Sequence, residues 1–230
     1  TAHKNGSIRA TTDYVDAVAK TDVSFLCVGT PSAPNGHLNL EYILQTAKEI
    51  GEALKTKQGF HIVVIRSTVF PGTNAKITAL IEENSGKKAN IDFAVVSNPE
   101  FLKQGAAVDD FLRPDRVVIG SNSQRSTEIM QELYSPFLRT GNPVIIMDVK
   151  SAEMTKYAAN SFLAVKISFA NEIANICEKV GADAEMVRIG MCSDNRIGSK
   201  FLFPGLGYGG SCFPKDTKAL KYQADKVGYH

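Results

Sequence analysis

The sequence predicts an α/β fold, with a partial Rossmann-type parallel sheet followed by a long central helix and a small helical domain. Two observations predict it. Short apolar runs alternate with helical periodicities up to about residue 148, as in sheets that helices cover on both faces. One helical pattern then continues without a break from residue 151 to about 180. We therefore expect two domains, at residues 1–148 and 149–230.

The expected strands are apolar runs that end at glycine or polar residues, as buried parallel strands do. They cover residues 22–29, 61–66, 92–96, 116–120 and 144–147. Between them we expect helices at 13–20, 40–54, 74–83 and 124–138. The 40–54 helix has Asn39 as a candidate cap, and its apolar residues at helical spacing are Tyr42, Ile43, Ala47, Ile50 and Leu54.

Polar motifs follow three of the expected strands. They are residues 29–32 (GTPS), 66–68 (RST) and 97–100 (SNPE). Each alone is compatible with ordinary turn chemistry. Because ligands bind at the carboxyl ends of parallel strands, the recurrence of these motifs favours a site along one edge of the sheet.

The pattern from 151 to 180 predicts one helix that Ser151 caps and Gly181 ends. Its apolar residues cover most of its circumference, which is typical of a helix buried in a large protein or between subunits. We therefore predict a homodimer through the 151–180 helix. Lys156 and Asn160 share one face near its start. The lysine either reaches water or faces a site.

A glycine-rich segment lies near the C-terminal end, at residues 205–216 (GLGYGGSCFPKD). Gly205, Gly207 and Gly210 fit the dinucleotide fingerprint, but no adequate strand precedes them, as that motif requires. We interpret the segment as a loop that presents Cys212 at the start of a helix near Pro214, where free amides favour a thiolate. A structural loop with an inert cysteine is the alternative.

Composition excludes several other classes. The chain has 230 residues, 43% hydrophobic and 22% charged, with a net charge of +2 and no long basic cluster, so we expect no nucleic-acid partner. No apolar run reaches about 18 residues, so no membrane association is expected. Four cysteines without C-x-x-C spacing argue against zinc and against disulfides, and favour the cytoplasm. A cysteine hydrolase would need a histidine partner for Cys212, and none is identifiable.

Six motifs in order resemble those of the nucleotide-sugar 6-dehydrogenase family, most closely its UDP-glucose 6-dehydrogenases. They lie at 29–31 (GTP), 66–68 (RST), 98–102 (NPEFL), 156–163 (KYAANSFL), 196–198 (RIG) and 207–216 (GYGGSCFPKD). The resemblance covers nearly the whole chain. It implies an NAD domain, a central dimer-forming helix, and a four-electron oxidation of a UDP-sugar at C6 that uses two NAD.

The resemblance also assigns roles to residues. Cys212 is the nucleophile that forms a thiohemiacetal and then a thioester, and Lys156 stabilises the oxyanion. Asp216 and Asn160 orient water and the C6 oxygen, and Thr68 and Glu100 act in water positioning or acid–base steps. The expected substrate contacts are Phe101, Leu102, Lys103, Arg196, Phe203, Gly205, Tyr208 and Gly209. The expected NAD contacts are Val28, Thr30, Pro31, Ser67, Gln104 and Lys215; no metal is expected.

The chain departs from the family pattern in three ways. The N-terminal G-x-G-x-x-G unit and the C-terminal domain are missing, so we expect an internal fragment that is inactive alone. Gln104 stands where the family more often has Glu. Two alternatives to a UDP-glucose enzyme stay open. One is a GDP-mannose 6-dehydrogenase, which shares the thioester chemistry, and the other is a non-catalytic dimerisation fragment.

Overall fold

The structure is a computed structural model that describes residues 4–33, 35–138 and 142–230. The chain divides into two compact units. Unit 1 comprises residues 1–30 and 39–154, and unit 2 comprises residues 31–38 and 155–230. The domain boundary expected at residue 148 stays a prediction.

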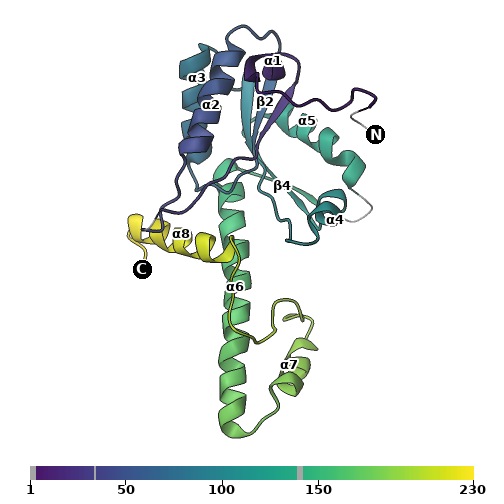
Figure 1. The fold of residues 1–230 in the computed structure, drawn as a ribbon, viewed down its shortest axis with the longest axis vertical. Helices are drawn as coiled ribbons and strands as arrows, with labels where there is room; N and C mark the ends of the chain where they lie inside the picture. The colour runs from purple at the N-terminus through teal and green to yellow at the C-terminus, as the bar shows by residue number, and fades with distance from the viewer. Residues whose placement is uncertain (1–3, 34, 139–141) are drawn as a thin grey trace. The chain divides into compact units, whose positions relative to one another are not determined.

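Unit 1 is built on a five-stranded sheet in the order β1-β2-β3-β4-β5 (Figure 1). The strands are β1 (Val23–Leu26), β2 (His61–Ile65), β3 (Phe93–Ser97), β4 (Val117–Gly120) and β5 (Val144–Met147). Three of the four pairings are parallel. The predicted parallel sheet is confirmed except at one junction, where β3 and β4 pair antiparallel through Ser97 and Gly120. Between them lies only the six-residue helix α4 (Ala107–Leu112), shorter than the helix of an ordinary parallel crossover.

Helices cover both faces of this sheet, as expected. They are α1 (Tyr14–Ala19), α2 (Glu41–Leu54), α3 (Thr73–Ser85) and α5 (Gln124–Tyr134). Alternate residues of β2 enter two cores: Val63 and Ile65 pack with α2 and α3, whereas Ile62 and Val64 pack with residues of α5. Figure 1 shows α2 and α3 together on one face and α5 on the other.

Some predicted helix details are wrong. Tyr42 is 57% exposed and is not part of the α2 core. Helix α5 ends at Tyr134, four residues early, because the 3₁₀ turn Ser135–Phe137, with Pro136 in it, follows. Helix α6 (Val149–Val180) begins before Ser151. The Asp148 carboxylate accepts the Ser151 amide at 3.0 Å, so Asp148 is the cap.

The start of α6 packs closely on β4. A Cβ at Gly120 would lie 2.5 Å from the Cβ of Ala152 and 3.1 Å from the Cα of Val149. Such separations are shorter than carbon–carbon contacts allow. Glycine is therefore required at the end of β4 for the first turn of α6 to approach the sheet.

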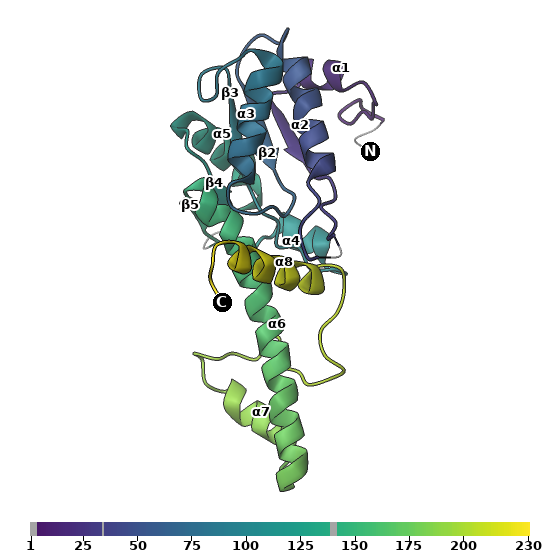
Figure 2. The ribbon, with the colours of Figure 1, turned by 90° about the vertical axis from the view of Figure 1, so that its left-hand side faces the viewer.

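Unit 2 consists of α6 from residue 155 onward together with α7 (Ala184–Cys192) and α8 (Phe213–Lys226). Figures 1 and 2 show α7 beside the C-terminal part of α6 and α8 beside its earlier turns. Asp183 caps α7 by accepting the amides of Glu185 and Met186. In the part of the chain that the structure describes, no helix is long and apolar enough to cross a lipid bilayer.

The apolar circumference of α6 is only partly buried within this chain. Ala164, Ala170 and Cys177 are buried. One row of large side chains is exposed, and it comprises Phe162, Val165, Phe169, Ile176 and Val180, which we call the α6 stripe. Because successive members are three, four, seven and four residues apart, they lie on one side of the helix.

Candidate functional site

The loops after β1 and β2 are joined by side-chain hydrogen bonds. The Ser67 hydroxyl donates to the Val28 carbonyl oxygen at 2.7 Å, and the Thr30 hydroxyl donates to the Thr68 carbonyl oxygen at 3.0 Å. The structure thus brings together four of the predicted site residues at the carboxyl edge of the sheet. Beside them, Gly29 is exposed, and a Cβ there would meet no atom within 4 Å. This edge presents open backbone next to hydroxyl groups.

The helix that follows β2 has little capacity to bind an anion at its N-terminus. Glu153, which is 3% exposed, accepts the amides of Gly72 at 2.8 Å and Asn74 at 2.9 Å. Burial raises the pKa of Glu153, and the two amide hydrogen bonds act against that rise. These amides of α3 are already occupied by a carboxylate of the same chain.

The loop after β3 carries Glu100 to Gln104. The Glu100 carboxylate accepts the Leu102 amide at 2.7 Å. Lys103 is engaged by Asp110, through its ammonium at 2.8 Å and its amide at 2.7 Å, and this hydrogen bonding holds the pKa of the Asp110 carboxyl below its ordinary value. Gln104 is exposed. The loop is thus held in shape by contacts that its sequence did not predict.

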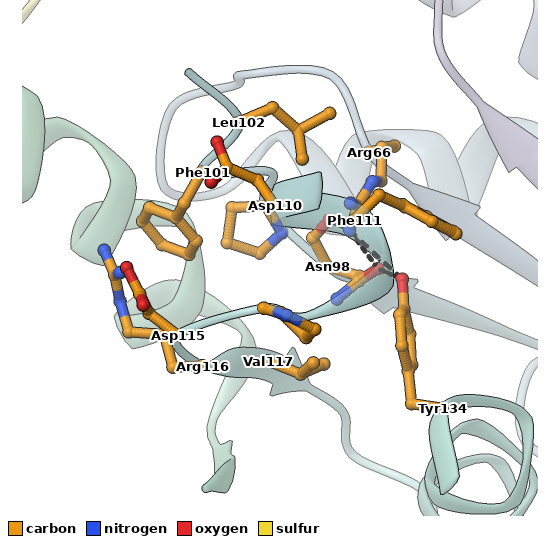
Figure 3. A pocket seen from close by; sticks show the side chains of 12 residues that line it. Arg66, Asn98, Phe101, Leu102, Asp110, Phe111, Asp115, Arg116, Val117 and Tyr134 are labelled. Atoms are coloured by element: carbon orange, nitrogen blue, oxygen red, sulfur yellow. Dashed lines mark hydrogen bonds between the residues drawn. The ribbon is translucent and has the colours of Figure 1, made fainter. Parts of the chain in front are cut away.

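Phe101 lies over a small pocket with side chains of residues 98–117 around it (Figure 3). The Arg116 guanidinium carbon lies 3.8 Å from the centroid of the Phe101 ring, within cation–π distance. The cavity measures about 30 Å³. That is room for about one water molecule, so the pocket is not itself a nucleotide site.

A buried polar group in unit 2 joins α6 to α8. Lys156, Asn160 and Asp216 are all at least 93% buried. The Asn160 amide nitrogen donates to Asp216 Oδ2 at 2.6 Å, and Lys215 Nζ donates to Asp216 Oδ1 at 2.6 Å. The expectation that Asn160 and Asp216 work together agrees with this geometry. Lys215, which was expected at the cofactor, is paired with Asp216.

Cys212 stands at the N-terminal end of α8, one residue before Phe213. It is exposed, and its sulfur lies 3.7 Å from the Ser211 hydroxyl. Residues 142–230 are all described and contain no strand between α7 and α8. The G-x-G-x-x-G match at Gly205 is therefore not a dinucleotide fingerprint, and the interpretation of a loop leading into a helix is confirmed.

Three side chains anchor the segment before the cysteine. Lys166 Nζ donates to the Ile197 carbonyl oxygen at 3.2 Å, and Asn171 Oδ1 accepts the Gly205 amide at 2.8 Å. The Arg188 guanidinium lies 4.6 Å from the Phe203 ring centroid. No sequence pattern indicates these anchors, because polar residues on amphipathic helices resemble ordinary surface positions.

The remaining predicted substrate residues of unit 2 lie along the same segment. Arg196 is exposed and its guanidinium is paired with the Asp194 carboxylate at 2.5 Å. The Tyr208 ring packs edge-on against Phe213, with centroids 6.3 Å apart. Phe203 is 58% exposed, and Gly205 and Gly209 are exposed as well. This segment offers exposed rings, a cation and open backbone to a ligand. In the described residues, no group of His, Cys, Asp and Glu could hold a metal ion.

Comparison with known proteins places these residues in a family. Residues 1–138 match the UDP-glucose/GDP-mannose dehydrogenase family, NAD binding domain, and residues 150–230 match the central domain of the same family. The chain is 48% identical over 223 residues to UDP-glucose 6-dehydrogenase YwqF of Bacillus subtilis, which covers 97% of this chain and 49% of that protein. The chain spans about half the length of the curated relatives it matches.

Solved structures agree with this placement. A UDP-glucose dehydrogenase from Pyrobaculum islandicum has a TM-score of 0.93 and 39% identity, over 99% of this chain and 52% of that one. A ternary complex of GDP-mannose dehydrogenase from Pseudomonas aeruginosa has a TM-score of 0.80 and 43% identity, over 99% and 52%. The two matched domains together span almost the whole sequence. The chain therefore belongs to the UDP-glucose/GDP-mannose dehydrogenase family.

Proposed function

We propose that this chain supplies the NAD-binding and central parts of a dehydrogenase that oxidises UDP-glucose to UDP-glucuronate. The observation that carries the proposal is the hydrogen-bonded Asn160–Asp216–Lys215 group, whose amide and carboxylate are buried, beside a helix that begins at an exposed thiol, Cys212. Burying an amide and a carboxylate has a desolvation cost, which hydrogen bonds offset only in part. A four-electron oxidation needs such a nucleophile and a polar group that handles water and the C6 oxygen.

The edge after β1 and β2 fits a dinucleotide. Val28, Thr30, Pro31 and Ser67 border an open glycine backbone at Gly29, as polar atoms that fix a ligand do. Gln104 and Lys215 are the further contacts we assign to NAD. When bound, NAD accepts a hydride from C6 in each of two oxidations.

The thiol makes the second oxidation feasible. The Cys212 sulfur attacks the C6 aldehyde carbon, and the carbonyl oxygen becomes an oxyanion that Lys156 stabilises. Loss of hydride from this thiohemiacetal gives a thioester. Asp216 and Asn160 orient the water that attacks it, and the thiolate then leaves with the C–S bond broken and the acid formed. A thiolate is a good leaving group from an acyl carbon, which an alkoxide is not.

The other predicted residues complete the assignment. Thr68 and Glu100 position water or transfer protons. Phe101, Leu102 and Lys103, together with Arg196, Phe203, Gly205, Tyr208 and Gly209, contact the sugar nucleotide. Most of them are at least partly exposed on the loops described above, where a ligand can reach them.

We also propose that the protein is a homodimer through the α6 stripe. The exposed fractions of its five side chains run from 48% to 70%. A row of large apolar side chains along one side of a long helix fits the same row of a second copy.

The decisive experiment measures NADH formed per UDP-glucose consumed by the whole protein. We expect two, and an adduct on Cys212 when substrate is trapped and the peptides are analysed by mass spectrometry. Cys212→Ser should abolish the adduct and net acid formation. A ratio of one, or an adduct on Cys27 or Cys192 instead, would contradict the mechanism.

GDP-mannose is the second candidate substrate, because the GDP-mannose dehydrogenase matches at 43% identity. Parallel assays with the two sugar nucleotides separate the candidates. We expect a higher kcat/KM with UDP-glucose. Turnover with GDP-mannose alone would assign the chain to the other branch of the family. A whole protein that oxidises neither would favour a dimerisation module.

A further inference from the structure

One buried amide ties together three elements of unit 1. Asn98, at the end of β3, is 0% exposed. Its Oδ1 accepts from Arg66 Nη1 at 2.8 Å and from the Tyr134 hydroxyl at 2.6 Å, while its Nδ2 donates to the Val118 carbonyl oxygen at 2.8 Å. Arg66 Nη1 also lies 3.1 Å from the Tyr134 oxygen. Figure 3 shows the three side chains converging from the end of β2, the end of β3 and α5; we call them the Asn98 clamp.

The clamp lies directly before two loops of the proposed site. Arg66 immediately precedes Ser67 and Thr68, and Asn98 is two residues before Glu100. The hydrogen bond between Arg66 and Asn98 therefore fixes the bases of both loops relative to each other. Hydrogen bonds between buried polar groups specify one arrangement more strictly than apolar contacts do.

Tyr134 is the third side chain of the clamp. Its ring is part of the α5 core and it is 4% exposed. Because its hydroxyl donates to the same oxygen that Arg66 uses, it restricts the Asn98 side chain to one rotamer. Arg116 contacts the same loop near its start by lying over Phe101, the residue after Glu100. The cavity beneath has room for about one water molecule, so the loop has little space to collapse into.

We propose that Tyr134 is a positioning residue of this enzyme, which acts through Asn98 and Arg66 on the loops that carry Thr68 and Glu100. The inference rests on the proposed function for what the loops do, and on the structure alone for how they are held. The hydroxyl of Tyr134 is hydrogen-bonded to both Asn98 and Arg66, and its effect on the loops is transmitted through these two side chains.

The test is Tyr134→Phe in the whole protein, with Tyr14→Phe as the matched control. Tyr14 lies in the same unit and donates its hydroxyl to the Glu52 carboxylate at 2.9 Å, away from the clamp. We expect Tyr134→Phe to lower kcat/KM for UDP-glucose by about tenfold, within the range that small misplacements of reacting groups produce. Amide hydrogen exchange at Leu102 and Lys103 should quicken by a similar factor, and exchange in β2 should stay unchanged. The control should change neither quantity.

A second pair of variants tests the route. Arg66→Lys keeps a donor for Asn98 Oδ1 and should retain most of the loop protection, whereas Arg66→Met should lose it. Uniformly faster exchange throughout unit 1 in Tyr134→Phe would mean that the residue only packs the core, and would overturn the proposal. Unchanged loop exchange, or faster loop exchange with unaltered kcat/KM, would overturn it too. If the wild type does not oxidise UDP-glucose, the proposed function fails, and the exchange measurement alone decides whether the clamp holds the loop.

Discussion

His61 should make the stability of unit 1 strongly dependent on pH. It opens β2 and is 0% exposed. Its Nδ1 lies 3.1 Å from the Thr21 carbonyl oxygen and its Nε2 lies 2.9 Å from the Ser24 hydroxyl. Burial, and secondly the Lys57 ammonium, lower the pKa of His61 from 6.5 to about 4. Lys57 Nζ donates to the same Thr21 oxygen at 2.5 Å, so a second cation there would be repelled.

The direction and size of the effect follow from that pKa. Well above pH 6.5 the imidazole is neutral in both the folded and the unfolded chain, and it adds no pH dependence. As the pH falls from 6.5 towards 4, only the unfolded chain takes up the proton, so the free energy of unfolding decreases. At about 1.4 kcal/mol per pKa unit the loss is roughly 3 kcal/mol by pH 4. Below that pH both states are protonated and the contribution levels off.

The assay is hydrogen exchange of the β2 amides in the whole protein, converted to opening free energies between pH 7 and pH 4. His61→Gln should show a flatter pH profile than the wild type, and the difference between the two profiles isolates this side chain from the carboxylates. Ser24→Ala keeps the imidazole and should keep the wild-type slope. If His61→Gln and the wild type follow the same slope from pH 6.5 to pH 4, the reasoning is refuted.

Two further predictions concern unit 2. Asn171→Ala removes the acceptor for the Gly205 amide, which leaves the glycine-rich segment held at one end, and should lower kcat/KM for UDP-glucose about tenfold, the value of roughly one hydrogen bond. Asn171→Asp keeps an acceptor oxygen and should restore kcat/KM, whereas an unchanged kcat/KM in Asn171→Ala would show that this hydrogen bond does not hold the loop in place. Phe169→Glu, in the α6 stripe, should shift the dimer towards monomer in sedimentation equilibrium. The expected loss in dimerisation free energy is about 2 kcal/mol or more, the scale of an interface hot spot. Asn175→Glu, exposed on another side of α6, is its control, and a wild type that sediments as a monomer would exclude the dimer.

The sequence predicted what depends on local pattern. The five strands lie within a few residues of their expected places because continuous apolar runs mark buried strands. Val144–Met147 agrees at both ends. The antiparallel β3–β4 pairing was missed because the orientation of β4 depends on the path of the 98–116 connection, which has no periodicity. The cap of α6 was missed because both Asp148 and Ser151 are residue types that cap helices, and only the hydrogen bond distinguishes them.

In the candidate site, too, contacts between segments that are distant in the sequence could not be predicted from local patterns. Asn160 and Asp216 were paired through a family resemblance, and the structure places them 2.6 Å apart. Asn98 and Arg66 stood inside recognised motifs, yet their bond to each other could not be foreseen, because it depends on the order of the strands. Tyr134 lies in none of the recognised motifs, so the sequence did not indicate its place in the Asn98 clamp. In the sequence, Glu153 is indistinguishable from an ordinary charged surface residue of a helix. In the structure it is 3% exposed, and its carboxylate accepts hydrogen bonds from two backbone amides.

The two asparagines of α6 explain how a glycine-rich loop can deliver a nucleophile accurately. Asn160 and Asn171 are eleven residues apart, which is three helical turns, so they lie on one face about 16 Å apart along the axis. Asn171 holds the Gly205 amide and Asn160 holds the Asp216 carboxylate, and these two residues are the first and last of the glycine-rich segment. Gly207 and Gly210 have φ values of +114° and +80°, which other residues rarely adopt. A chain of such freedom would place Cys212 poorly if only one end were fixed. Because a single rigid helix fixes both ends, the glycines are free to bring backbone close to a ligand while the range of positions open to the thiol stays limited.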